Sequence, residues 1–397
     1  MLNSIIFSVY FYDKVTRLQF LLGIIFLFFL LVKKRRIFFN KKILWLSLII
    51  IIYSLIILTK NNYNYRKILQ QSVVCGIIIL SYFNLFKYYP LKKIWNTYMK
   101  MGILFSYLAI LQGVIYYLLQ IDIFIKPYNI WGLNGSYILS KKLIQVTSIA
   151  GEPGMFAQVL LPAVIFTLEK ILKRKKIKWN DIVILIAYLW TLTAIAFFSI
   201  GIYGILKFII LLKNKKMKNI IIFLIFLSII LILVLNKIKT DILEKKIIES
   251  FGAVFNFNTI NYYKINLSSF ALFSNIKAAL NSNNYILGNG FGSIAEVYYQ
   301  YFTLTDHKFY GQNAEDGYSL LVRIFSEFGI LGVILISIYI LNRINFNDKN
   351  WLRRTINLSS FIGIISYFIR GGSYFMQGVV IFFLFLSFSQ NKKYRSF

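Results

Sequence analysis

The chain has 397 residues, of which 58% are hydrophobic and 15% are charged, and its formal net charge is +31. Soluble domains contain roughly 45–50% apolar and about 25% charged residues, so this composition excludes a soluble domain and predicts a membrane protein. The excess of lysine and arginine does not indicate a nucleic-acid partner, because these residues stand in short segments between hydrophobic runs and no nucleic-acid-binding motif accompanies them.

Hydrophobic runs that can cross a bilayer, roughly 17–25 residues long, recur along the whole chain. They predict an all-α fold, a polytopic bundle of about 11 to 12 transmembrane helices that forms one integral membrane domain over residues 1–397. The run at 2–12 is too short to cross alone and predicts either a half-helix or part of a twelfth span. The predicted spans cover residues 18–32, 43–59, 68–86, 101–121, 152–169, 182–198, 199–212, 219–235, 319–341, 356–370 and 374–389.

Lysine and arginine are distributed unequally between alternate loops, and the richer set of loops is expected to face the cytoplasm. With this orientation the C-terminus is inside and the N-terminus outside, unless residues 2–12 add a membrane segment. Two outward-facing segments are then long, 122–151 and 236–318. Because long loops in compact proteins are usually functional, the loop 236–318 is expected to carry the chemistry. The basic set comprises residues 33–42, 87–100, 170–178, 213–218, 342–355 and the tail after 390.

The entry to the fifth predicted span, SIAGEPGMFAQVLLP (148–162), places Glu152 before Pro153 at the start of a helix. A carboxylate in this position stabilises the helix dipole, and the alternative role is to orient a bound sugar. Lys141 and Lys142 precede it in the same outward-facing segment.

The long outer loop contains a segment, residues 266–293, that predicts an amphipathic helix followed by a glycine-rich turn. Its apolar side chains recur at helical spacing, at Phe270, Phe273, Ile276 and Leu280. The glycines that follow, Gly288, Gly290 and Gly292, permit positive φ or a close backbone approach, although a plain tight loop would also contain them.

The acidic pair Glu315-Asp316 leads directly into the span 319–341, which carries Arg323 and Glu327 in its first turns. The i, i+4 spacing puts these two side chains on one helix face, where they can pair. Charged groups within a span usually face the interior of a bundle or a water-filled cavity. The alternative is a structural ion pair near the membrane interface.

These motifs together resemble the signature of the bacterial O-antigen polymerase and O-antigen ligase superfamily. LGNGFGS (287–293) followed by DGYSLLVRIFSEFGILG (316–332) is similar to its glycine turn and helix entry, and the segments 148–162, 192–205 and 368–375 follow the same order. The chain departs from the ligase pattern, because Glu315-Asp316 stand where ligases have His-Asn and His307 lies about eight residues too early. The departures favour a polymerase over a ligase.

The resemblance implies a metal-independent and cofactor-independent glycosyltransferase of the bacterial inner membrane. It would join undecaprenyl-diphosphate-linked oligosaccharide units into O-antigen or capsule, with membrane lipid and a chain-length regulator protein as further partners. Such a reaction needs cations that stabilise the departing diphosphate and a base that accepts the proton of the attacking sugar hydroxyl.

Candidates for both roles lie on the predicted outer side. Arginine forks onto diphosphate oxygens better than lysine, so the expected binding residues begin with the two arginines. An interfacial anchor is the alternative role for Arg370, and a solvated loop residue is the alternative for His307. The residues expected to bind the diphosphate or the glycan are Arg370, Arg323, Lys141, Lys142 and Glu152. The catalytic candidates are Glu315, Asp316 and His307. Because the chain has one cysteine and one histidine, no metal site is expected.

Three other functions remain open at this point. A lipid-linked oligosaccharide flippase or another transporter also has about twelve spans, but it would be expected to contain repeated halves, and no repeat is visible. An O-antigen ligase has the same ordered motifs. A glycosyltransferase that uses polyprenyl-monophosphate sugars usually has acidic residues in its first outer loop, and residues 60–67 contain none.

Overall fold

The computed structural model describes residues 1–11, 18–61, 65–121, 138–140, 143–213, 265, 267–282, 284–374 and 376–390. Within these ranges the protein is all-α, apart from one small antiparallel hairpin of β1 (Ile138–Ser140) and β2 (Leu143–Ile144). The predicted span 219–235 and the residues Lys141 and Lys142 lie outside the described residues. The helices are α1 (Leu2–Tyr10), α2 (Leu18–Lys34), α3 (Lys41–Asn61), α4 (Tyr65–Tyr88), α5 (Leu91–Leu119), α7 (Pro153–Leu172), α8 (Trp179–Trp190), α9 (Ala194–Lys213), α13 (Leu267–Asn281), α14 (Ile294–Tyr301), α15 (Leu320–Leu341), α16 (Trp351–Ile369) and α17 (Val379–Gln390).

Four of the described helices are long and apolar enough to cross a membrane, which makes this chain a helical membrane protein. They comprise Ile68–Tyr88, Leu91–Leu119, Pro153–Leu172 and Leu320–Leu341, and shorter apolar stretches lie in α3, α8, α9 and α17. Many large apolar side chains on their outer surfaces are exposed, among them Leu118 and Leu335. Exposed apolar faces of this kind suit a lipid environment, in which the bilayer covers them.

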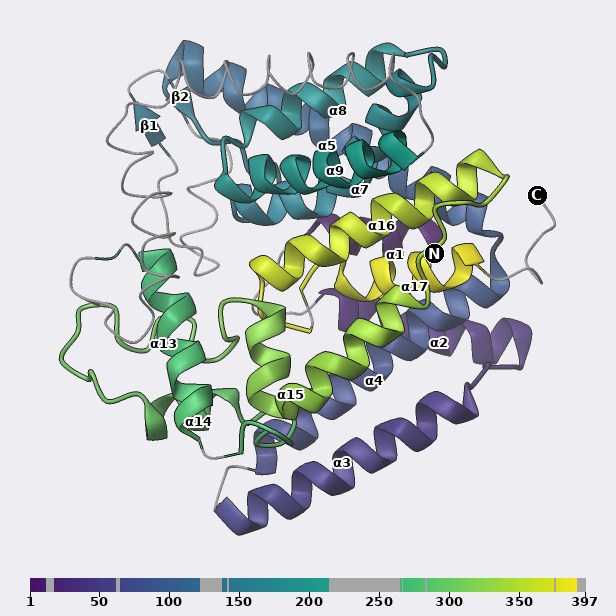
Figure 1. The fold of residues 1–397 in the computed structure, drawn as a ribbon. Helices are drawn as coiled ribbons and strands as arrows, with labels where there is room; N and C mark the ends of the chain where they lie inside the picture. Colours follow the sequence, from purple (N-terminus) through teal and green to yellow (C-terminus); the bar gives the residue numbers. More distant parts are fainter. Residues whose placement is uncertain are drawn as a thin grey trace.

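Helix α7 forms the centre of the bundle. Nearly all its side chains from Pro153 to Glu169 are buried, and it packs against α16, α8 and α9 (Figure 1). A helix that is apolar on all its faces has no surface suited to water, so it is stable only when surrounded by other helices or by lipid. Helix α16 also packs against α17, and its Gly363 lies close to both Pro162 of α7 and Phe382 of α17.

The short N-terminal run forms the nine-residue helix α1, which fits either predicted alternative, a half-helix or part of a twelfth span. It packs against α2 and α5, and Ile6, Val9 and Tyr10 are completely buried. Met1 lies beside Tyr89 and Pro90 at the turn between α4 and α5. The first residues therefore lie at the same end of the bundle as the basic segment 87–100, contrary to the outward N-terminus expected in the absence of an added segment.

The basic segments that are predicted to be cytoplasmic lie close to one another. The amide of Phe38 donates to Asn84 near the end of α4, at 2.8 Å, which brings segment 33–42 to the α4–α5 turn. Lys175 lies 3.5 Å from the centre of the Trp351 ring, which brings segment 170–178 to the start of α16. At the opposite end of the bundle lie α13, α14 and the β1–β2 hairpin (Figure 1).

Two helix boundaries differ from the prediction. Helix α5 begins at Leu91 rather than at 101, because Pro90 stands directly before its first turn and the lysines 92, 93 and 100 are accommodated on its surface. The break between α8 and α9 lies at 191–193 rather than at 199–201. The segment after β2 donates hydrogen bonds to two carbonyls at this break. The amide of Val146 donates to the carbonyl of Trp190, and the side chain of Gln145 donates to the carbonyl of Leu192. This tertiary capping stabilises the earlier break.

Candidate functional site

The first two turns of α15 position the charged residues of the predicted site. Ser319 is the N-cap of this helix, and its hydroxyl accepts a hydrogen bond from the amide of Val322 at 3.1 Å. Arg323 and Glu327 follow on one helix face, as their spacing predicts. The helix is interrupted directly afterwards, because Gly329 has φ 64° and ψ −166°.

The glycine-rich loop of LGNGFGS completes the interrupted helix. The amide of Gly290 donates to the carbonyl of Glu327 at 2.9 Å, and the amide of Ile330 donates to the carbonyl of Tyr285 at 2.9 Å. The loop thus satisfies backbone groups that the break leaves without helical partners, as buried backbone polar groups require. Gly288 has φ 81°, and a Cβ atom there would overlap the backbone of Glu327. This close approach explains why glycine occupies position 288.

Arg323 and Glu327 form a buried ion pair with a Nε–Oε1 distance of 3.0 Å, and their side chains are 2% and 0% exposed. Arg323 also donates to the Oε1 atom of Gln71 on α4 at 2.9 Å. The hydroxyl of Tyr374 donates to Glu327 at 2.9 Å, and its ring centre lies 4.5 Å from the guanidinium carbon. A buried pair is stable only when additional hydrogen bonds satisfy its remaining atoms, and Gln71 and Tyr374 provide these bonds.

The turn after α16 connects this buried pair to the acidic turn before α15. Arg323 donates to the carbonyl of Gly372 at 3.5 Å, and the amide of Gly371 donates to the carbonyl of Tyr318 at 2.7 Å. Gly372 packs so closely on the carbonyl of Asp316 that a side chain at this position would overlap it. The residues 316–323 and 370–374, which lie far apart in the sequence, therefore form one structural unit.

Arg370 lies at the end of α16 and points toward the start of α7. Its Nη2 atom is 3.9 Å from a carboxylate oxygen of Glu152, and the two side chains are 36% and 34% exposed. The side chain of Gln158 on α7 donates to the carbonyl of Arg370, which fixes the backbone at this point. Glu152 is the N-cap residue of α7, but its carboxylate makes no capping hydrogen bond. The structure brings these two predicted residues together, with both side chains accessible.

The acidic pair lies in the turn before α15. Asp316 accepts hydrogen bonds from the amide of Tyr318 at 3.0 Å and from the side chain of Asn313 at 3.2 Å, whereas the side chain of Glu315 is exposed. The ring of Tyr318, the residue that Asp316 helps to orient, lies 5.9 Å from the guanidinium carbon of Arg370. Asp316 and Arg370 are thus linked through Tyr318.

His307 lies in a different environment. It is 4% exposed, its ring stacks on Phe270 at 4.1 Å, and its Nδ1 atom accepts a hydrogen bond from the amide of Phe309 at 3.1 Å. Phe270 of α13 and Phe302, which directly follows α14, belong to the same buried aromatic cluster. The alternative of a solvated loop residue is therefore wrong for His307. Its described contacts are those of a core histidine, and its catalytic role stays a prediction.

The tyrosines near His307 contact other aromatic residues of this cluster. Tyr298 is completely buried, its hydroxyl accepts a hydrogen bond from the amide of Gly311 at 3.3 Å, and burial raises the pKa of its phenol above the usual value. Tyr299 is 53% exposed and packs edge to face on Tyr298. Of these two rings, that of Tyr299 has the exposed surface on which a sugar could stack.

Sequence reasoning missed two residues of the unit, Gln71 and Tyr374. Gln71 had a visible signal, because the pair Gln70-Gln71 interrupts an otherwise apolar run, and a polar side chain within a span normally has a buried partner. Tyr374 had no such signal among 28 tyrosines. Its role depends on the turn at 371–374, which the linear pattern does not specify.

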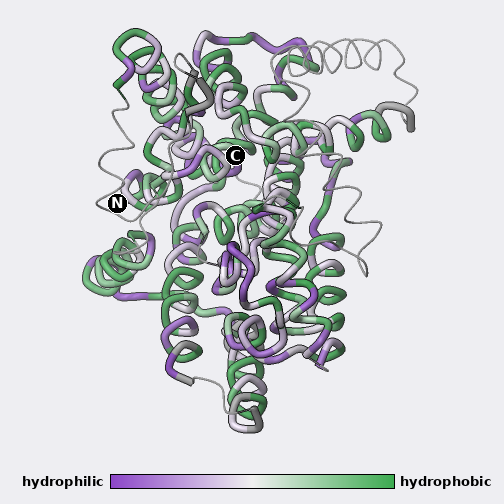
Figure 2. Tube along the Cα trace, turned by 90° about the vertical axis from the view of Figure 1, so that its left-hand side faces the viewer, coloured by the Kyte–Doolittle hydropathy of each residue, from purple (hydrophilic) through white to green (hydrophobic). Residues whose placement is uncertain are grey.

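Viewed from the end that carries α13 and α14, hydrophilic segments gather near the centre, with hydrophobic helices around them (Figure 2). The fold and this arrangement define a helical membrane protein with a cluster of charged residues at one end of its bundle. Comparison with known protein families, with curated protein sequences and with solved structures finds no match for this chain.

Proposed function

We propose that the protein is a glycosyltransferase that polymerises polyprenyl-diphosphate-linked oligosaccharide units on the outer face of a bacterial inner membrane. In this proposal the chain crosses the membrane about twelve times, counting the N-terminal segment that begins with α1 on the cytoplasmic side, and the long segment 236–318 faces outward. The product is a surface polysaccharide, either O-antigen or capsule. The resemblance of its ordered motifs to the polymerase and ligase superfamily is the starting point for this proposal.

The observation that carries the proposal is the accessible Arg370–Glu152 pair next to the acidic turn of Asp316. An arginine that is 36% exposed and 3.9 Å from its carboxylate partner can rotate toward an anionic ligand. Partly exposed ion pairs contribute little free energy, so an incoming diphosphate can compete with Glu152 for the guanidinium. Arginine is suited to this exchange because its planar fork matches two phosphate oxygens.

The chemistry assigns a separate role to each charged group. A hydroxyl oxygen of the acceptor sugar attacks the anomeric carbon of the donor, and the bond between this carbon and the diphosphate oxygen breaks. The hydroxyl proton passes to a carboxylate of the acidic turn, Asp316 or Glu315, and Arg370 stabilises the negative charge that develops on the leaving diphosphate. Glu152, which is released from Arg370, is then available to accept a hydrogen bond from a sugar hydroxyl.

Arg323 has a positioning role in this scheme, because its donors are directed at Glu327, Gln71 and Gly372. A guanidinium that is 2% exposed cannot reach a diphosphate without the loss of these bonds. Its effect on the reaction passes through the turn 370–374, which holds Arg370 beside the acidic turn.

A transporter of lipid-linked oligosaccharides is the second candidate, and the interrupted helix α15 favours it. Transporter sites are often formed by discontinuous helices with charged residues inside the membrane, and α15 has both a break at Gly329 and a buried ion pair. The exposed charges at one end of the bundle favour the polymerase, because a flippase needs its binding groups along the path between the leaflets.

Deletion of the gene and analysis of the accumulated lipid-linked glycans distinguishes the candidates. A polymerase defect leaves single repeat units on the lipid carrier in the outer leaflet. Single units confined to the cytoplasmic leaflet would indicate a flippase, and finished polymer that remains on the lipid would indicate a ligase. Restoration of polymer by the wild-type gene, but not by a gene with Arg370→Ala, would tie the phenotype to the proposed site.

A further inference from the structure

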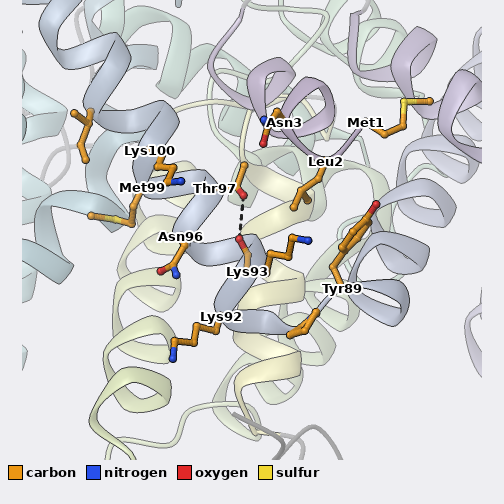
Figure 3. A pocket seen from close by; sticks show the side chains of 12 residues that line it. Met1, Leu2, Asn3, Tyr89, Lys92, Lys93, Asn96, Thr97, Met99 and Lys100 are labelled. Carbon is orange, nitrogen blue, oxygen red and sulfur yellow. Dashed lines mark hydrogen bonds between the residues drawn. The ribbon is translucent and has the colours of Figure 1, made fainter.

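A cavity of about 920 Å³ lies between the start of α1 and the first three turns of α5, far from the charged residues described above. One wall is a single face of α5, with Lys92, Lys93, Asn96 and Lys100 (Figure 3). The facing wall includes Leu2, and the close-up shows Leu2 and Asn3 turned toward the side chains of α5. The described residues that line the cavity include no carboxylate.

The three lysines are arranged along the helix axis. Lys92, Lys93 and Lys100 are exposed, and the span from 92 to 100 corresponds to about 12 Å of helix. The Nζ atom of Lys93 lies 5.3 Å from the centre of the Tyr89 ring, so this side chain is directed back toward the α4–α5 turn. Met99 and Ile103, which are half-buried, add apolar surface to the lining, and Ile103 lies further along α5 from the α4–α5 turn. The lining therefore combines exposed cationic side chains with a half-buried apolar surface.

The length of α5 places the lysines at the level of lipid headgroups. Its 29 residues form a helix about 43 Å long, whereas the hydrocarbon core is about 30 Å thick. About nine residues of α5 therefore extend beyond the hydrocarbon, and these match the basic segment from Leu91 onward. The lysine excess of this segment predicts the cytoplasmic leaflet, where anionic lipids are concentrated.

The cavity is separate from the candidate site. Gln71 of α4 binds Arg323, and Tyr89, which directly follows α4, lines the cavity. The two residues are 18 positions apart, which corresponds to about 27 Å of helix. The two sites therefore occupy opposite ends of the bundle, and a ligand of one cannot contact the other.

We propose that this cavity binds the headgroup of an anionic phospholipid from the cytoplasmic leaflet. The phosphate is held by Lys92, Lys93 and Lys100, and an acyl chain follows the apolar surface of Met99 and Ile103. The apolar part of the lining favours a phospholipid over a free phosphate, which would leave that surface unused. Basic pockets between membrane helices on the cytoplasmic side are suited to headgroups of this charge. The proposal does not depend on the reaction at the other end of the bundle.

Lipid titration of the purified, detergent-solubilised full chain, followed by native mass spectrometry, tests the proposal. The probes are phosphatidylglycerol, phosphatidylcholine with the same acyl chains, and inorganic pyrophosphate as a soluble competitor. The variants are the triple substitution Lys92→Gln, Lys93→Gln, Lys100→Gln and each single substitution. The matched control removes three charges from another exposed basic segment at the same end, through Arg174→Gln, Lys175→Gln and Lys176→Gln.

We expect the wild-type chain to retain phosphatidylglycerol in preference to phosphatidylcholine. Each lysine substitution should weaken this binding about fivefold and the triple about a hundredfold, whereas the control should change it less than about twofold. An equal loss in the control would show unspecific surface attraction and would overturn the proposal. Equal retention of phosphatidylcholine, or displacement of the lipid by millimolar pyrophosphate, would overturn it as well. The single variants preserve the test if the triple variant fails to fold.

Discussion

Arg323 and Arg370 both lie at the end of the bundle that carries α13 and α14, but their surroundings differ. Arg323 is enclosed by a carboxylate, an amide oxygen, a backbone carbonyl and the face of Tyr374. Arg370 has a partly exposed side chain with one distant carboxylate, on a backbone held by Gln158. A cation that must exchange ligands during a reaction cycle needs a partly exposed environment such as that of Arg370. Replacement of Arg370 is therefore expected to affect the reaction, whereas replacement of Arg323 is expected to affect the stability of the protein as well.

The replacement Arg370→Ala should abolish polymer and leave protein abundance near normal, because this side chain is partly exposed and its ion pair with Glu152 contributes little free energy. Arg370→Lys should restore polymer only in part, since an ammonium keeps the charge but loses the bidentate fork. The measurement is polysaccharide chain length on gels together with immunoblots of membranes. Arg354→Ala, at the other end of α16, is the matched control and should polymerise normally. Full polymer from Arg370→Ala would identify Arg370 as an interfacial anchor.

The acidic turn contains the two carboxylates proposed to accept the proton of the acceptor hydroxyl. Glu315→Gln and Asp316→Asn keep shape and hydrogen bonding but remove the proton acceptor, so at least one should stop polymerisation and cause single lipid-linked units to accumulate. His307→Ala should instead lower the thermal stability of the protein, because it leaves a hole beside Phe270. Normal polymer from both amide variants, combined with none from a well-folded His307→Ala, would transfer the role of base to His307.

Side-chain spacing was sufficient to predict some of these residues and not others. The i, i+4 pair of Arg323 and Glu327 follows from helix geometry alone. The approach of Arg370 to Glu152 could not be predicted, because it depends on the packing of α16 against α7, over 200 positions apart. The environment of His307 was predicted wrongly, since nothing in the local sequence indicates that the loop folds back onto Phe270.

Among the elements, α15 shows most clearly how the local sequence and the tertiary structure combine. Gly329 interrupts a helix that is largely apolar, and the loop 285–290 supplies the missing hydrogen bonds. The sequence predicted one uninterrupted span over 319–341, because a single glycine within an apolar run is usually tolerated in a helix. The interruption depends on the partner loop, which lies about forty residues earlier in the chain.

Gly329→Ala should therefore destabilise the protein strongly. Alanine at φ 64° is strained by about 1–2 kcal/mol, and its Cβ would overlap the carbonyl of Ile286. Gly76→Ala in α4 is the control, because no atom lies within 4 Å of a Cβ built there. Thermal melting in detergent should show a clear decrease for Gly329→Ala and almost no change for Gly76→Ala. Equal melting of the two variants would mean that α15 is continuous in the membrane.

The ion pair in α15 is open to a double-mutant test. Arg323→Met alone leaves Glu327 buried without its cation and should lower stability by about 3–5 kcal/mol. The double variant Arg323→Met, Glu327→Leu should be clearly more stable than this single variant, while polymer remains absent because the turn 370–374 has lost its anchor. Melting curves and polymer analysis of the single and double variants measure both effects. A double variant with normal polymer would contradict a positioning role for Arg323.

At the scale of the whole molecule, the alternation of basic and long polar segments predicts the topology. Reporter fusions after residues 40, 175 and 350 should report the cytoplasm, and fusions near 135 and 280 the outside. A cysteine introduced at Asn3, in a Cys75→Ser background, should be labelled from the cytoplasmic side, because Met1 lies beside the α4–α5 turn. A cytoplasmic signal at 280 would contradict both the topology and the proposed reaction, since the donor lipid is presented on the outer leaflet.

The enclosed position of α7 has a consequence for how this protein is made. Its buried side chain Gln158 bonds to carbonyls of Ser366 and Arg370, which are synthesised about 210 residues later. At about 5–20 residues per second, the ribosome needs roughly 10–40 seconds to reach them. During that interval α7 is in the membrane without the helix that covers its largest interface. In a chain that terminates before α16, this face of α7 stays uncovered permanently. The cell can therefore recognise the unfinished product by the uncovered face of α7.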